Sequence, residues 1–199
     1  MNGSTQKDVR RMVQRTLEIC EVAAVYTLKL GLRPCAVFDL DATLITETDR
    51  GIEPTLDLVQ RLQQIGVKCY IVTARTSDNY KYTQQLVNRL AQSYPCLRKM
   101  PLFCLPLESV GSSDLMKMSS KKQYDMISVF KYMTRWGIHT GVGPVILAMG
   151  DQLWDVRYPH GKDVKRDGSD MCFMEFDKHE AQLLSVKLPR GVMKHWRNH

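Results

Sequence analysis

The sequence predicts an α/β fold: a doubly wound, mostly parallel Rossmann-like sheet of about five strands, with helices on both faces. Two observations lead to this prediction. Short apolar runs alternate along the chain with longer segments whose apolar residues recur at helical spacing. Several of the apolar runs end abruptly in acidic or hydroxyl side chains, which open α/β sheets gather at the edge where they bind ligands.

A single domain follows from the length of the chain. Its 199 residues are enough for one α/β core and too few for two. The composition, with 44% hydrophobic and 25% charged residues, is ordinary for a folded domain. We expect residues 1–33 to form an N-terminal helix that packs on a core at residues 34–199.

Each element has its own local signals. Apolar residues at helical spacing predict helices, and short apolar runs predict buried strands. Gly31 and Gly66 are expected to end the first two helices, and Pro54 to begin the second. In chain order we expect a helix at 6–31, a strand at 35–38, a helix at 54–65, a strand at 67–72, a helix at 78–93, a strand at 101–105, a helix at 119–136, strands at 144–149 and 171–176, and an irregular basic tail at 187–199.

Two acids stand at the carboxyl end of the first predicted strand. Asp39 and Asp41 flank one residue, so in extended chain their side chains point to the same side. At a separation of about 4 Å and an effective dielectric near 20, their repulsion is roughly 4 kcal/mol. A divalent cation would compensate it, and Mg²⁺ prefers carboxylate and carbonyl oxygens.

Polar residues also follow the other predicted strands. Thr73 follows the second strand, Lys121 and Lys122 open the helix after the third, and Asp151 and Asp155 follow the fourth. A doubly wound sheet would bring these segments to one edge, beside the acid pair. Carboxylates there can attack phosphorus and transfer protons, while hydroxyls, lysines and helix N-termini hold phosphoryl oxygens. The pattern therefore predicts phosphoryl transfer assisted by a metal ion.

These segments resemble the four motifs of the haloacid dehalogenase superfamily of phosphohydrolases. The first motif is similar to residues 38–44, FDLDATL, and the second to residues 71–73, IVT. The third is similar to Lys121 or Lys122, and the fourth to residues 150–155, GDQLWD. The form of the fourth motif, together with the VKLP run at 186–189, resembles the acid-phosphatase-like branch of the superfamily.

The resemblance implies a role for each matching residue. Asp39 would be the nucleophile and Asp41 the general acid and base. Thr73 and one lysine would bind the phosphoryl group. Of the two candidates we favour Lys121, because Asp125 lies one helical turn further on and is placed to hold it.

The resemblance also implies a magnesium site. Its ligands would come from Asp39, Asp41 through its backbone carbonyl, Asp151, and Asp155 through water or by orienting a neighbour. The expected activity is Mg²⁺-dependent hydrolysis of a phosphomonoester through an aspartyl-phosphate, on a nucleotide or another small phosphorylated substrate. The alternatives are a polynucleotide 3′-phosphatase, a phosphoprotein phosphatase, and a non-catalytic module that binds phosphate.

Charge and the spacing of the motifs bear on the partners. A net charge of +7 favours anionic partners, nucleic acid among them. Too few residues separate Thr43 from the next predicted helix for a large cap domain there, so we expect an open site. No run is apolar enough for a membrane span, and residues 1–15 lack the apolar core of a secretory signal. The six cysteines form no Cys-x-x-Cys pair, so we expect an intracellular, cytoplasmic protein of undetermined oligomeric state.

Overall fold

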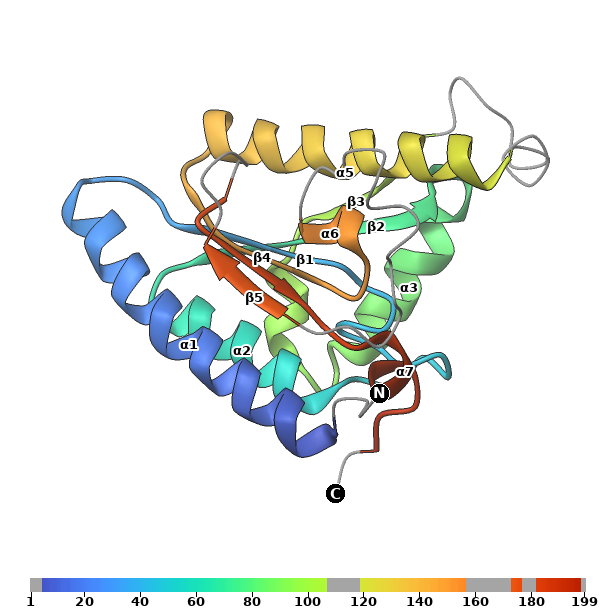
Figure 1. Cartoon of the computed structure of the whole chain (residues 1–199), viewed down its shortest axis with the longest axis horizontal. Coiled ribbons are helices and arrows are strands. Elements are labelled where there is room, and N and C mark those ends of the chain that lie inside the picture. Colours follow the sequence, from blue (N-terminus) through green and yellow to red (C-terminus); the bar gives the residue numbers. More distant parts are fainter. Residues whose placement is uncertain (1–4, 107–118, 157–172, 177–181, 198–199) are drawn as a thin grey trace.

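A six-stranded sheet forms the centre of the protein, with helices on both sides (Figure 1). The computed structural model describes residues 5–106, 119–156, 173–176 and 182–197. The strand order is β3-β2-β1-β4-β6-β5, and only β5, at one edge, runs antiparallel to its neighbour. The mixed α/β class and the mostly parallel sheet predicted from the sequence are therefore confirmed.

The elements follow the predicted order closely through the first half of the chain. The strands are β1 (Cys35–Phe38), β2 (Lys68–Thr76), β3 (Leu102–Leu105), β4 (Val145–Gly150), β5 (Phe173–Phe176) and β6 (Leu184–Lys187). The helices are α1 (Gln6–Lys29), α2 (Glu53–Gln64), α3 (Tyr80–Leu90), α5 (Ser120–Gly141), α6 (Leu153–Val156) and α7 (Arg190–Lys194), with short 3-10 turns η1 (Ser77–Asn79) and η2 (Pro95–Lys99). Gly31 and Gly66 have φ values of 73° and 90°, the left-handed conformation expected just beyond a helix end.

The two faces of the sheet bury different side chains. Along β1, Ala36 and Phe38 belong to a large apolar cluster that also contains residues of α1, α2 and α3. Cys35 and Val37 point the other way, into a smaller cluster that includes Ile138 of α5. This alternation follows from the period of two along a strand, and it explains why β1 is apolar at every position.

The tail contains regular structure that the sequence analysis did not predict. Residues 187–199 were expected to be irregular, yet β6 ends at Lys187 and α7 follows within the tail. All four residues of β6 are buried, because the strand lies between β4 and β5 in the sheet. The sequence analysis therefore missed β6, in which even Lys187 is buried.

The helix before β4 is longer than expected. It was predicted to end near residue 136 but continues to Gly141. Gly137 is exposed and costs the helix only about 1 kcal/mol, while Ile138 is buried against the sheet. The basic loop expected at 158–170 lies outside the described residues. No helix in the described ranges is long and apolar enough to cross a membrane.

Candidate active site

The candidate site lies where the chain changes direction across the sheet. The chain passes from β1 to β2 and β3 on one side and then returns across β1 to β4 on the other, so the strand order reverses beside β1. Open α/β sheets bind ligands at such a switch point, beyond the carboxyl ends of the strands. Phe38 is level with Ile71 of β2 and with Met149 of β4, and the Asp39 N–H donates to the Met149 carbonyl at 2.9 Å. Residues that follow these strands therefore meet.

Three predicted acids come together at this point. Oxygens of Asp39, Asp151 and Asp155 lie within 4.8 Å of one another. The three residues are only 6%, 3% and 4% exposed, respectively. Such close and buried carboxylates repel strongly unless cations accompany them.

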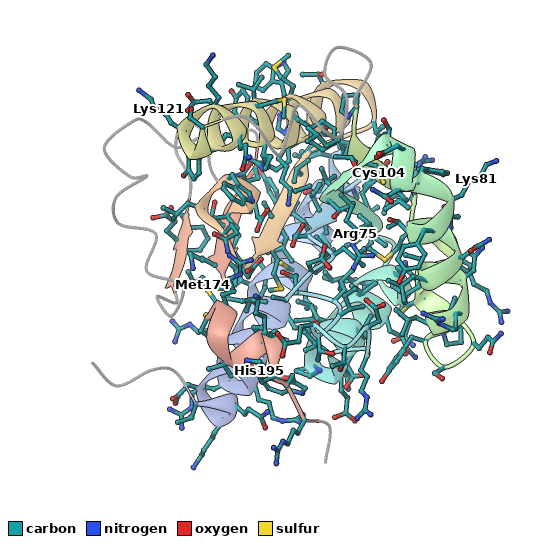
Figure 2. The ribbon with its side chains drawn as sticks, turned by 90° about the vertical axis from the view of Figure 1, so that its right-hand side faces the viewer. Arg75, Lys81, Cys104, Lys121, Met174 and His195 are labelled. Carbon is teal, nitrogen blue, oxygen red and sulfur yellow. The ribbon has the colours of Figure 1, made fainter. Side chains whose placement is uncertain are left out.

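A lysine that the sequence analysis missed lies among these acids. Lys131, whose side chain is 2% exposed, contacts Asp39 Oδ1 at 2.5 Å and also bonds to Asp155 Oδ1. Lys121 and Lys122 are exposed in the first turn of α5. At a rise of 1.5 Å per residue, the backbones of Lys121 and Lys131 are about 15 Å apart along the helix axis. Figure 2 shows Lys121 at the edge of the molecule, far from Arg75 near its centre.

The helical period of α5 carried the signal for Lys131. Tyr124, Ser128, Lys131, Arg135 and Ile138 are all buried, and their spacing alternates between three and four residues. Lys131 is thus on the face that α5 turns towards the sheet. Lys121 continues the same spacing but is exposed in the first turn of the helix, and Lys122 is off that face. The prediction that one of those two lysines binds the phosphoryl group is not supported by this arrangement.

Asp155 is held from two sides. Its Oδ1 accepts from Lys131, and its Oδ2 accepts from the Gln152 N–H at 2.8 Å. Arg135, fully buried one turn beyond Lys131, donates to the carbonyls of Trp154 and Asp155 at 3.0 and 2.9 Å. Because both of its carboxylate oxygens already accept hydrogen bonds, Asp155 is better suited to orienting Lys131 and the turn after β4 than to binding a metal directly.

The electrostatics of the cluster indicate an excess of negative charge. Burial and the neighbouring Asp155 raise the pKa of Asp39 well above its usual value, although Lys131 opposes this. Burial and Asp155 also raise the pKa of Asp151 to about 7. Burial by itself would lower the pKa of Lys131, but Asp155 and Asp39 raise it, so the lysine stays charged. Hard carboxylate oxygens with unbalanced charge fit a divalent cation such as Mg²⁺.

The fourth predicted acid faces a different partner. Asp41 has a half-exposed side chain, and Arg75 binds both of its oxygens, with Nε to Oδ2 at 3.0 Å and Nη2 to Oδ1 at 2.7 Å. Thr73 is buried at the end of β2, and its Oγ1 accepts from the Arg75 N–H at 3.2 Å. The structure thus places Asp41 and Thr73 at the predicted edge of the sheet, and Arg75 is a second cation there, to which the sequence analysis gave no role.

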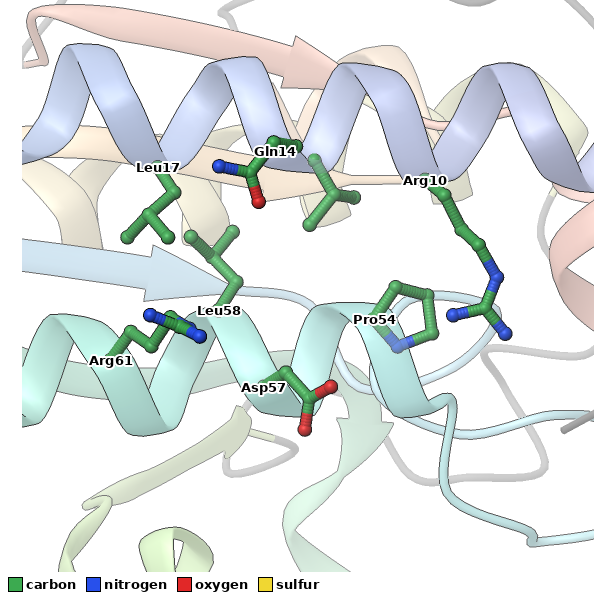
Figure 3. Close-up of a pocket in the computed structure, with 8 residues that line it drawn as sticks. Arg10, Gln14, Leu17, Pro54, Asp57, Leu58 and Arg61 are labelled. Atoms are coloured by element: carbon green, nitrogen blue, oxygen red, sulfur yellow. The ribbon is translucent and has the colours of Figure 1, made fainter.

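A separate hollow lies between two helices. It has a volume of about 210 Å³ and is lined by residues of α1 and α2 (Figure 3). Arg10 and Arg61 contribute to this lining together with Asp57. No candidate site residue lines it, and Arg10 is already paired with Glu53 at 3.3 Å. This hollow is therefore separate from the carboxylate cluster.

Comparisons with known proteins give a fold-level similarity. No protein-family model and no curated protein matches the sequence. The class C acid phosphatase from Bacillus anthracis is a similar solved structure, with a TM-score of 0.48 and 16% identity over 82% of this chain and 71% of that chain. Its tungstate-bound structure gives a TM-score of 0.47 and 14% identity over the same shares.

Proposed function

We propose that the protein is a Mg²⁺-dependent phosphomonoester hydrolase that acts through an aspartyl-phosphate. One observation carries the proposal: the buried acids Asp39, Asp151 and Asp155 cluster at the switch point, Lys131 bonds to two of them, and Asp41 lies half-exposed two residues after Asp39. A nucleophile, a cation for phosphoryl oxygens and a separate acid that solvent can reach are the groups that this reaction needs.

The first half of the reaction uses Asp39 and Asp41. A carboxylate oxygen of Asp39 attacks phosphorus, and the bond between phosphorus and the leaving oxygen breaks. Asp41 donates a proton to that oxygen, so the leaving group departs as an alcohol. In the second half, Asp41 takes a proton from water, the water oxygen attacks phosphorus, and phosphate leaves as the Asp39 carboxylate is restored.

The remaining residues hold the reacting groups. Lys131, 2.5 Å from Asp39 Oδ1, is the cation best placed to meet a phosphoryl oxygen, and we assign it the role first predicted for Lys121 or Lys122. Thr73 would offer its hydroxyl from the end of β2. Asp39, Asp151 and the Asp41 carbonyl would hold Mg²⁺. When bound, the metal would neutralise phosphoryl oxygens and favour the ionised form of the nucleophile.

Phosphate release is the test of this proposal. We expect the purified protein to release phosphate from a panel of nucleotides and sugar phosphates with Mg²⁺, and to stop when EDTA is added. Asp39→Asn should remove essentially all turnover, because the amide cannot form the aspartyl-phosphate. Asp57→Asn, on the exposed surface of α2, is the matched control and should keep it. Turnover that persists in Asp39→Asn would contradict the mechanism, and turnover indifferent to EDTA would contradict the metal.

The substrate class needs a separate comparison. We propose a nucleotide or another small phosphorylated compound, and the net charge of +7 makes a nucleic-acid end the specific alternative. A 3′-phosphorylated oligonucleotide distinguishes the two possibilities. A preference for the oligonucleotide that falls steeply with salt, while hydrolysis of the mononucleotide does not, would favour the alternative.

A further inference from the structure

The contacts of Arg75 assign it a part in the reaction. Its guanidinium binds both oxygens of Asp41, so the plane and direction of that carboxylate are set by Arg75. Asp41 would otherwise be free to turn, because its side chain is 51% exposed. The side chain of Arg75 is only 21% exposed, so Arg75 is the more rigid partner and acts as a clamp on Asp41.

Arg75 is itself held in place from its own strand and from a loop. Its N–H donates to Thr73 Oγ1, which fixes the backbone at the end of β2. Asp49 Oδ1, in the loop after β1, lies 3.5 Å from Arg75 Nη2. Tyr82 of α3 donates to the other Asp49 oxygen at 3.4 Å. Arg75 is thereby held by its own strand and by the loop after β1, and that loop is in turn held by α3.

The buried acids make such a clamp necessary. Asp41 stands next to a cluster that already contains Asp39, Asp151 and Asp155, and like charges repel. Without a partner, the half-exposed Asp41 would be free to turn towards water and away from the phosphoryl group. Arg75 keeps it at the mouth of the site instead.

We propose that Arg75 is a positioning residue that orients Asp41 for proton transfer to the leaving group; this rests on the proposed function. Arg75 acts through Asp41 and does not bind the phosphoryl group. Loss of the clamp lowers the rate of proton transfer and leaves the affinity for phosphate unchanged. A lysine cannot replace it, because a single ammonium cannot bind both oxygens in a fixed plane.

Two phosphate esters separate this role from a structural one. An alkyl ester such as glycerol phosphate needs its leaving oxygen protonated, whereas 4-nitrophenyl phosphate needs little help. We expect Arg75→Met and Arg75→Lys to lower kcat/KM for the alkyl ester by about 100-fold, with a clearly smaller loss on the aryl ester, because this ratio reports only the steps up to formation of the aspartyl-phosphate. The inhibition constant of inorganic phosphate should stay within about threefold of wild type, because phosphate binding is unaffected.

A double variant and a control complete the experiment. Asp41→Asn should show the same preference for the aryl ester, and adding Arg75→Met to it should cause little further loss. Arg89→Met, an exposed arginine of α3, should behave as wild type, and melting temperatures check that each variant is folded.

Three results would overturn the inference. The first is an equal loss of kcat/KM on the two esters, and the second is an inhibition constant of phosphate raised tenfold or more. The third is a double variant of Arg75→Met and Asp41→Asn whose loss of kcat/KM is the product of the two single losses. If Arg75→Met retains wild-type rates, this inference alone fails. If wild-type protein hydrolyses neither ester, both the proposed function and this inference are contradicted.

Discussion

Replacing Lys131 by methionine tests the electrostatics of the site without relying on activity. The lysine is buried between Asp39 and Asp155 and bonds to both. Methionine fills much of the same volume but leaves two buried carboxylates without their cation. Removing one partner of a buried ion pair typically costs about 3–5 kcal/mol, so we expect a loss of that size in the free energy of unfolding at pH 7 with EDTA present. Lys122→Met, exposed on the same helix, should change it by less than about 0.5 kcal/mol.

The pH dependence of this loss has a definite sign. Burial already raises the pKa of Asp39 above 3.8, and losing the lysine raises it further, because Lys131 is what lowers it. A carboxyl group whose pKa is raised by folding binds more protons in the folded state than in the unfolded state. Its contribution to stability therefore falls as the pH rises above 3.8 towards the folded pKa. The gap between Lys131→Met and wild type should narrow as the pH falls from about 7 to 5.

Urea unfolding followed by circular dichroism measures these differences. Mg²⁺ should stabilise Lys131→Met more than wild type, because the cation no longer competes with the lysine for the carboxylates. Adding Asp39→Asn to Lys131→Met should recover much of the lost stability, since it removes one of the two unpaired charges. A Lys131→Met protein as stable as wild type at pH 7 in EDTA would refute the assignment, as would a gap that widens on acidification.

Two further predictions concern the backbone around the site. A Cβ on Gly150 would lie 2.1 Å from the Cβ of Asp155, so Gly150→Ala should displace that turn and lower the free energy of unfolding by about 1–3 kcal/mol in urea titrations. Ala42 has a φ of 52°, which strains a non-glycine residue. Ala42→Gly should therefore leave the urea midpoint of unfolding unchanged or raise it. Ala91→Gly, at a φ of −67° beyond α3, should lower that midpoint. A lower midpoint for Ala42→Gly would contradict the strain.

Arg75 shows where sequence reasoning reached a residue without its role. Its position two residues after Thr73 places it near the predicted edge of the sheet, but nothing in the local sequence indicates its partner. The contact to Asp41 spans 34 residues and joins the ends of two adjacent strands. That contact depends on the register of β1 against β2, which the local sequence does not reveal.

The tail shows a similar separation between local and distant information. The basic residues of 187–199 suggested an irregular tail, and no strand was predicted at 184–187. β6 forms nevertheless, since a place between β4 and β5 buries Leu184 and Val186 and satisfies the backbone. Whether such a short run becomes a strand is decided by the partners that the rest of the sheet offers it.

The sequence by itself determined the fold class, the edge of the sheet that carries the chemistry, and the acids that gather there. It could do so because an apolar strand followed by acids is a local pattern, and parallel strands bring their carboxyl ends to one edge. Tertiary structure alone decided which cations meet those acids, Lys131 at Asp39 and Arg75 at Asp41. The choice depends on which face α5 turns inward and on how neighbouring strands align, and both are set by packing between segments far apart in the chain.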